Sequence, residues 1–122
     1  WKAFEDSIGG EIYVKKIPSI RITDVAKAIA PDAAIEYTGI RPGEKLHEQM
    51  IGFDDAPFTY EYNDYYKILP SIHEWNKDEF RQKKGKLVED GFTYSSDSNK
   101  EWMDIEELKE WIELNKHTFL NT

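Results

Sequence analysis

The residues best suited to chemistry in this 122-residue chain lie in one segment, Gly39 to Glu48, with the sequence Gly-Ile-Arg-Pro-Gly-Glu-Lys-Leu-His-Glu. Pro42 fixes its own φ and holds Arg41 extended, and Gly43 permits a tight turn. Arg41 would then project from the turn, where its guanidinium can bind a phosphate through two parallel hydrogen bonds. Glu44 offers two carboxylate oxygens that can accept hydrogen bonds from a sugar diol.

A purely structural interpretation of Arg41 and Glu44 stays open from the residues alone. Arg41 can pair with a surface acid, and Glu44 can stabilise the positive end of a helix without any ligand. The pattern predicts such a helix over Glu44 to Ile51, with Leu46 and Met50 on one face. The free amides at its start would favour a nearby anion. We expect His47 to be a partly buried helix residue that hydrogen-bonds to backbone.

The motifs of a complete active site are missing from the sequence. It contains no Gly-x-Gly-x-x-Gly, no Gly-Lys-Ser/Thr loop and no Gly-x-Ser-x-Gly. None of the seven tyrosines is followed four residues later by lysine. With no cysteine and three histidines far apart, the sequence predicts no metal site. We therefore predict no catalytic residue and no bound cofactor in this chain.

The charge balance, the apolar runs and the cysteine count of the sequence argue against several kinds of function. Sixteen Lys and Arg stand against 24 Asp and Glu, a formal net charge of −8. This balance argues against nucleic-acid binding, but it leaves room for one anionic ligand held by local cations. No run approaches the ~18 apolar residues of a membrane span, and no signal-peptide pattern is present. The lack of cysteine is compatible with the cytoplasm, which is the predicted location.

The elements that would position these residues alternate in the first half of the chain. The pattern predicts a helix end, a strand, a helix begun by an N-cap at Thr23, and a second strand, over residues 1–8, 11–15, 24–30 and 34–38. Such alternation favours a small α/β fold, a short sheet flanked by helices.

The second half is dominated by an aromatic run and a terminal helix. Phe58 to Tyr66 contains five aromatic residues and predicts a strand, whose rings we expect to pack rather than to stack on a ligand. Asp104 and Glu107 form a capping box for an amphipathic helix over Ile105 to Ile112. The pattern also predicts a loop and a short helix, over residues 52–57 and 76–84.

Several segments, in the same order, resemble the nucleotide-sugar 4,6-dehydratases of the extended short-chain dehydrogenase/reductase superfamily. The closest resemblance is to the inverting UDP-N-acetylglucosamine 4,6-dehydratases of bacterial glycan and polysaccharide synthesis. It covers most of the chain and rests on the Arg-Pro-Gly-Glu-Lys-Leu-His-Glu motif together with Gly9 to Val14, Lys16 to Ala26, Tyr94 to Asn99 and the terminal helix.

The resemblance implies that residues 1–122, which open at Trp1 rather than Met, are the C-terminal substrate-binding region of such an enzyme, cut from its Rossmann-type part. In the family an N-terminal Rossmann domain binds NADP or NAD and supplies the catalytic Tyr and Lys. The reaction oxidises carbon 4 of the sugar, eliminates water across carbons 5 and 6, returns the hydride to carbon 6 and inverts carbon 5. We expect this fragment to be inactive alone.

The resemblance also implies roles for individual residues. Arg41 matches the position that contacts the nucleotide diphosphate, and Glu44 the position that holds the ribose hydroxyls. Lys16, with Ser19, lies where related enzymes carry a substrate-facing loop, which makes Lys16 a third candidate for a phosphate or sugar contact. The expected partners are a UDP-sugar, the N-terminal Rossmann domain and, in an oligomer, further copies of the protein.

Two alternatives remain open. The first keeps the superfamily but changes the outcome, to a UDP-sugar epimerase or a retaining dehydratase. The second is a non-enzymatic interaction module that binds another protein through its acidic face and aromatic strand.

Overall fold

The computed structural model describes residues 2–72 and 78–120. The chain divides into two compact units. Unit 1 comprises Trp1–Ile17 and Gln49–Ser98, and unit 2 comprises Pro18–Glu48 and Asn99–Thr122.

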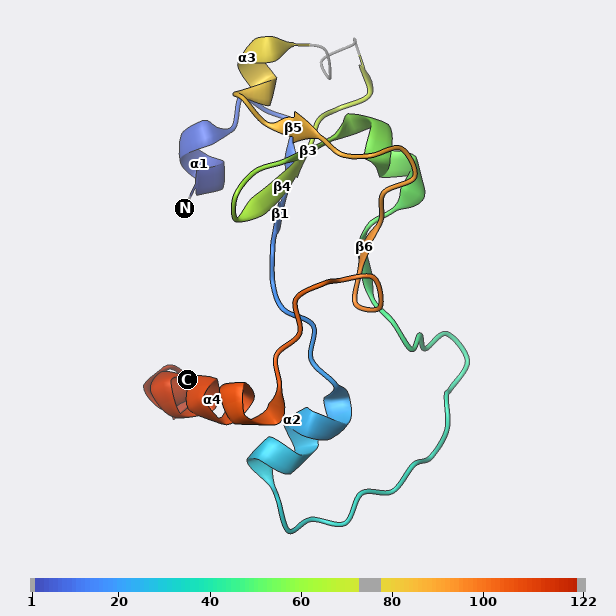
Figure 1. The fold of residues 1–122 in the computed structure, drawn as a ribbon, viewed down its shortest axis with the longest axis vertical. Coiled ribbons are helices and arrows are strands. Elements are labelled where there is room, and N and C mark those ends of the chain that lie inside the picture. Colours follow the sequence, from blue (N-terminus) through green and yellow to red (C-terminus); the bar gives the residue numbers. More distant parts are fainter. Residues whose placement is uncertain (1, 73–77, 121–122) are drawn as a thin grey trace. The chain divides into compact units, whose positions relative to one another are not determined.

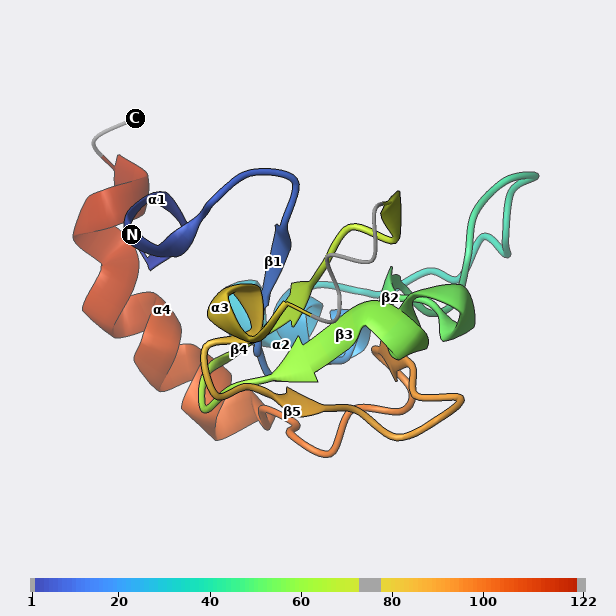
Figure 2. The same ribbon diagram turned by 90° about the horizontal axis from the view of Figure 1, so that it is seen from above.

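Unit 1 is built on a four-stranded antiparallel sheet with the strand order β1-β4-β3-β5. The strands are β1 (Ile12–Lys15), β4 (Tyr65–Ile68), β3 (Thr59–Glu61) and β5 (Lys86–Leu87) (Figure 1). The predicted aromatic strand is therefore a hairpin, in which the Tyr62 N–H donates to the Tyr65 carbonyl (2.9 Å). Figure 2 shows β5 running alongside β3.

The other elements of unit 1 are short. They are α1 (Lys2–Asp6), α3 (Glu79–Gln82), the 3₁₀ helix η1 (Phe53–Phe58), and a second sheet of β2 (Gln49–Ile51) and β6 (Tyr94–Ser95). The loop predicted over residues 52–57 is wrong, because η1 occupies most of it. The Gly52 N–H donates to Asp55 Oδ2 (3.1 Å) and the Asp55 N–H to the Gly52 carbonyl (3.1 Å), which winds the chain into this helix.

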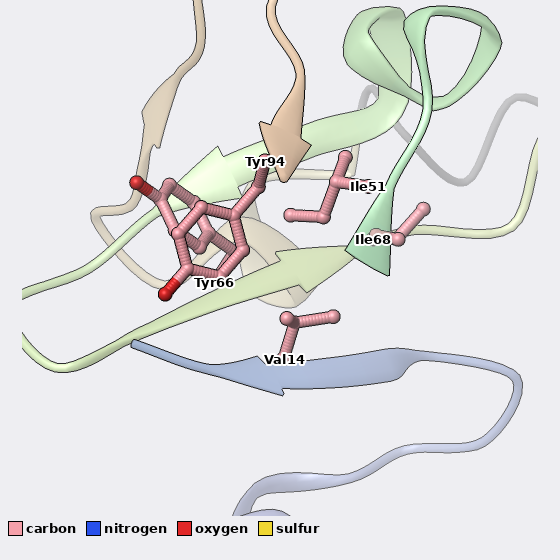
Figure 3. Close-up of a cluster of buried hydrophobic side chains, with 5 residues drawn as sticks. All are labelled: Val14, Ile51, Tyr66, Ile68 and Tyr94. Atoms are coloured by element: carbon pink, nitrogen blue, oxygen red, sulfur yellow. The ribbon is translucent and has the colours of Figure 1, made fainter. Parts of the chain in front are cut away.

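The core of unit 1 lies where the two sheets meet. Its buried side chains come from β1, β2, β4 and β6 and are Val14, Ile51, Tyr66, Ile68 and Tyr94 (Figure 3). The rings of Tyr66 and Tyr94 lie 5.1 Å apart between centroids. The Tyr94 hydroxyl donates to the Ile17 carbonyl and accepts from the Ile17 N–H, both at 2.9 Å. The aromatic residues of the run thus include packing residues, as predicted.

Unit 2 pairs two helices, α2 (Ile22–Ile29) and α4 (Ile105–Leu120). The predicted cap of α2 is wrong, because the N-cap residue is Arg21 and its side chain makes no capping bond. The capping box of α4 is confirmed. Asp104 Oδ1 accepts from the N–H groups of Glu106 and Glu107 (2.9 Å each), and Glu107 Oε2 accepts from the Asp104 N–H (3.0 Å).

The segment from residue 31 to residue 48 forms no helix and no strand (Figure 1). The strand predicted over Ala34 to Thr38 is wrong: Ile35 and Tyr37 are both exposed, and no strand lies beside them to complete a ladder. The helix predicted over Glu44 to Ile51 is also wrong. Pairing of β2 with β6 places Ile51 fully buried in the core, and this burial overrides a weak helical pattern. The α/β class is confirmed, with antiparallel rather than alternating topology.

Candidate functional site

The motif segment is organised by a tight turn over Arg41 to Glu44. The Glu44 N–H donates to the Arg41 carbonyl (3.0 Å), and the Arg41 N–H donates to Glu44 Oε2 (2.9 Å). Pro42 occupies the second position and Gly43 the third, with φ +88° at Gly43. These are the residues and the positive φ that a type II turn requires. The local sequence therefore explains the turn without help from distant contacts.

This turn places Arg41 and Glu44 at its two ends, and both side chains are exposed. One carboxylate oxygen of Glu44 closes the turn, whereas Oε1 accepts no hydrogen bond from the described residues. The Arg41 guanidinium forms no ion pair with any carboxylate in the described ranges. The pairing of Arg41 with a surface acid, which a purely structural role would require, is thus not seen in the described ranges. No helix begins at Glu44. The prediction that Glu44 stabilises the positive end of a helix is therefore wrong, and so is the prediction that free amides at a helix start favour an anion there.

Lys16 belongs to unit 1, whereas Arg41 and Glu44 belong to unit 2. Its ammonium is partly buried, lies 2.7 Å from Glu61 Oε1 and sits 4.9 Å from the centroid of the Tyr66 ring. Lys16 also lines an open cavity of about 600 Å³. Lys16 is therefore surrounded by a carboxylate, an aromatic face and an open cavity.

Two further residues of the motif segments have different environments. Ser19 is buried, and its backbone holds unit 2 together: its N–H donates to the Glu101 carbonyl (2.8 Å), and its carbonyl accepts from the Met103 N–H (2.9 Å). His47 is exposed and lies outside any helix, so the partly buried helical position predicted for it is wrong. The cause is the same as for the missing helix, the commitment of the following residues to β2.

Sequence reasoning missed a charge network inside unit 1. Lys67 is 1% exposed, and its ammonium lies 3.1 Å from Asp6 Oδ2. The hydroxyl of Tyr13 donates to the same oxygen (2.9 Å), and Lys83 contacts Oδ1 at 2.5 Å. Burial acts to raise the pKa of Asp6, but the hydrogen bonds from Lys83, Lys67 and Tyr13 outweigh it and lower the pKa to about 2.

A second buried ion pair joins Arg81 of α3 to Glu11, whose nearest atoms are 2.9 Å apart. Arg81 also donates to the Gly9 carbonyl (2.9 Å). Burial acts to raise the pKa of Glu11, but the backbone hydrogen bond from Gly9 and further hydrogen bonds lower it overall. No sequence pattern marks either network, because their ion-paired residues lie 61 to 77 positions apart. The low exposure of the Lys67, Arg81 and Glu11 side chains indicates a structural role.

Within residues 2–72 and 78–120 no group of three His, Asp or Glu side chains is arranged to hold a metal ion. In the same ranges no helix has both the length and the apolar character needed to cross a membrane.

Comparison with known proteins identifies the family to which this chain belongs. Residues 1–70 match the family described as polysaccharide biosynthesis protein. Since the match covers more than half of the chain, the chain belongs to this family.

Individual relatives are more specific. The chain is 50% identical over 114 residues to UDP-N-acetylglucosamine 4,6-dehydratase (inverting) of Campylobacter jejuni subsp. jejuni serotype O:2, covering 89% of this chain and 34% of the relative. It is 30% identical over 117 residues to UDP-glucose 4-epimerase of Rickettsia canadensis, covering 90% and 33%. The resemblance to inverting dehydratases predicted from the motifs is confirmed, and the chain spans about a third of these relatives.

A solved structure has a similar fold. The X-ray structure of Pen from Bacillus thuringiensis superposes with a TM-score of 0.72 at 25% sequence identity, covering 94% of this chain and 33% of that one. The likeness therefore extends across nearly the whole chain.

Proposed function

We propose that this chain is the substrate-binding region of an NADP- or NAD-dependent UDP-N-acetylglucosamine 4,6-dehydratase that inverts carbon 5, acting in bacterial glycan biosynthesis in the cytoplasm. Its role is to hold the UDP moiety of a UDP-N-acetylhexosamine. The observation that carries this proposal is the type II turn, which fixes an arginine and a carboxylate side by side in a chain 46–50% identical to such dehydratases.

Each residue of the turn has a defined task in this proposal. The Arg41 guanidinium forms a forked pair of charge-assisted hydrogen bonds with the diphosphate. Glu44 uses Oε2 to close the turn and keeps Oε1 for the ribose hydroxyls. Because Pro42 and Gly43 hold the turn before the ligand arrives, little backbone entropy is lost on binding. Lys16 is a third contact in the proposal, to a phosphate or to the sugar.

The nicotinamide cofactor is not held by these residues. The sequence contains no glycine-rich dinucleotide motif and no Tyr-x-x-x-Lys pair, so the chain does not fit that group. We infer that the cofactor and the catalytic Tyr and Lys belong to a Rossmann domain outside these 122 residues, and that the chain alone does not turn over substrate.

A UDP-glucose 4-epimerase is the second candidate, favoured by identities of 30–31% over 117 residues to the Rickettsia enzymes. Product analysis separates the two. NMR of the product formed by the full-length protein from UDP-N-acetylglucosamine would show a 4-keto-6-deoxy sugar inverted at carbon 5 for the dehydratase. For the epimerase it would show a sugar that keeps its 6-hydroxyl.

Calorimetric titration with UDP tests the binding role. In the full-length protein Arg41→Ala should weaken UDP binding by about 1.5–3 kcal/mol, the size of a charged hydrogen bond. Lys45→Ala, an exposed cation four positions along from Arg41, is the matched control and should leave the affinity unchanged. Equal affinity for Arg41→Ala and the parent would overturn the role of Arg41, and absence of any UDP binding would favour the interaction module.

A further inference from the structure

Unit 1 contains an open cavity of about 600 Å³ between the β3–β4 hairpin, α1 and the turn before β5. Six charged side chains line it. Four are the cations Lys2, Lys16, Lys84 and Lys86, and two are the carboxylates Glu61 and Asp64. The cavity thus carries two surplus positive charges on a chain whose net charge is −8. A local excess of cations against an acidic background marks a site for an anion.

The lysines of the cavity fall into two pairs. Lys2 lies 3.1 Å from Asp64, and Lys16 lies 2.7 Å from Glu61, so the charges of these two are balanced. Lys84 and Lys86 make no ion pair with any residue of the described part of the chain. The surplus charge therefore resides on Lys84 and Lys86.

The backbone that carries this second pair is held in an unusual conformation. Lys83 and Lys84 both have positive φ, 44° and 63°, which costs energy in residues with a side chain. At the next position a Cβ on Gly85 would lie 2.5 Å from Cζ of Tyr62, so only glycine fits against that ring. The hydroxyl of the same tyrosine donates to the Gln82 carbonyl, so this one side chain contacts the turn at both residues.

Two aromatic side chains of the β3–β4 hairpin, Tyr62 and Tyr65, also line the cavity. The rings of Tyr62 and Tyr65 stack in parallel with centroids 4.6 Å apart, and the Lys2 ammonium sits 5.3 Å from the Tyr65 centroid. This stacked pair therefore forms part of the cavity lining. A preformed, positively charged hollow loses little entropy when a small anion enters it.

We propose that this cavity binds the phosphate dianion of a small phosphorylated molecule, with Lys84 and Lys86 as the principal ligands. The two surplus charges match the two charges of the dianion, and lysine binds phosphate as a compact point charge. Lys2 and Lys16 also donate to the phosphate in this proposal, while they keep part of their contact with Asp64 and Glu61. The proposal shares Lys16 with the proposed UDP contacts, but its principal ligands, Lys84 and Lys86, have no part in the Arg41–Glu44 turn.

NMR titration of the isotope-labelled full-length protein with inorganic phosphate tests this site, with uridine monophosphate as a second probe. Phosphate should shift the amide resonances of residues 83–86, and the Lys84→Gln/Lys86→Gln double variant should bind it about tenfold more weakly or worse. Lys109→Gln removes an exposed cation of α4, outside the cavity, and should leave phosphate binding unchanged. Because all three lysines are exposed, these variants should fold, which circular dichroism checks.

The outcomes separate this site from the nucleotide turn. Phosphate binding that survives Arg41→Ala but is lost in the double variant supports the proposal, and it does so even if UDP fails to bind the turn. Binding of uridine monophosphate alone, lost with Arg41→Ala, would overturn it, because the phosphate would then belong to the Arg41–Glu44 turn. Equal binding by the parent chain and the double variant, or no shift at residues 83–86, would also overturn it.

Discussion

The Arg41–Glu44 turn and the Asp6–Lys67 network both contain a cation and a carboxylate, but they differ in how far these charges are exposed to solvent. The turn is built from four consecutive residues and leaves its guanidinium exposed to solvent. The network joins Asp6 to Lys67, 61 positions apart, and Lys67 is 1% exposed. A charge that is buried and paired is committed to the fold, whereas a charge that is held in place and exposed is available to a ligand. The difference predicts that substitutions in the network change stability and that substitutions in the turn change binding.

The largest expected effect is on stability, from Asp6→Ala. This change leaves Lys67 buried opposite no carboxylate, and breaking one side of a buried pair costs about 3–5 kcal/mol. Lys67→Met should cost much less, because it removes the buried charge while Lys83 and Tyr13 still contact Asp6. Urea denaturation measures both free energies of unfolding. A loss below about 1 kcal/mol for Asp6→Ala would show that the network is not needed for the fold.

The next effect is the acid dependence of stability. The pKa of Asp6 is lowered from 3.8 to about 2, so the folded state favours the ionised carboxylate. The corresponding stabilisation, about 2 kcal/mol, is fully present above pH 3.8 and disappears as the pH falls through 2. Denaturation curves at a series of pH values should show this loss in the parent chain. They should show a flatter profile in Asp6→Asn, and equal slopes would contradict the assignment.

In the turn, Glu44→Ala should act on binding through the ribose. Loss of one carboxylate contact costs UDP affinity about 1–2 kcal/mol. Calorimetry with UDP and with 2′-deoxy-UDP checks the role of the sugar hydroxyls. The parent should bind 2′-deoxy-UDP less tightly than UDP, and Glu44→Ala should bind the two alike. A preference for UDP retained in Glu44→Ala would place the ribose elsewhere.

The smallest effect concerns the strained turn of unit 1. Lys84→Gly relieves the positive φ of this residue but adds entropy to the unfolded chain, so we expect a net gain in stability of about 0.5 kcal/mol. The same change should weaken phosphate binding in the cavity. Thermal denaturation measures the first effect, and a lower melting temperature would show that Lys84 makes contacts that stabilise the fold.

Local signals in the sequence predicted part of this molecule well. The capping box at Asp104 and the Pro-Gly pair at residues 42 and 43 act through neighbouring backbone groups, so their geometry follows from the residues themselves. The sequence also predicted the α/β class and the packing role of Tyr66, because strand propensity and aromatic burial follow from the composition of the run from Phe58 to Tyr66.

What could not be predicted depends on distant partners. Residues 49–51 have a helical pattern, but pairing with β6, more than 40 positions away, makes them a strand. Similarly, Lys67 looks like an exposed strand residue until α1 brings Asp6 against it. The motif position predicts a substrate contact for Lys16, but it gives no sign of the neighbours Glu61 and Tyr66, which come from the distant β3–β4 hairpin.

The most direct test of the central claim is hydrogen exchange of the full-length protein with and without UDP, followed by mass spectrometry. The account predicts that UDP slows exchange in peptides covering residues 39–48, that Arg41→Ala abolishes this protection, and that Lys45→Ala retains it. Unchanged exchange across residues 39–48 at a saturating concentration of UDP would contradict the claim that this turn holds the nucleotide.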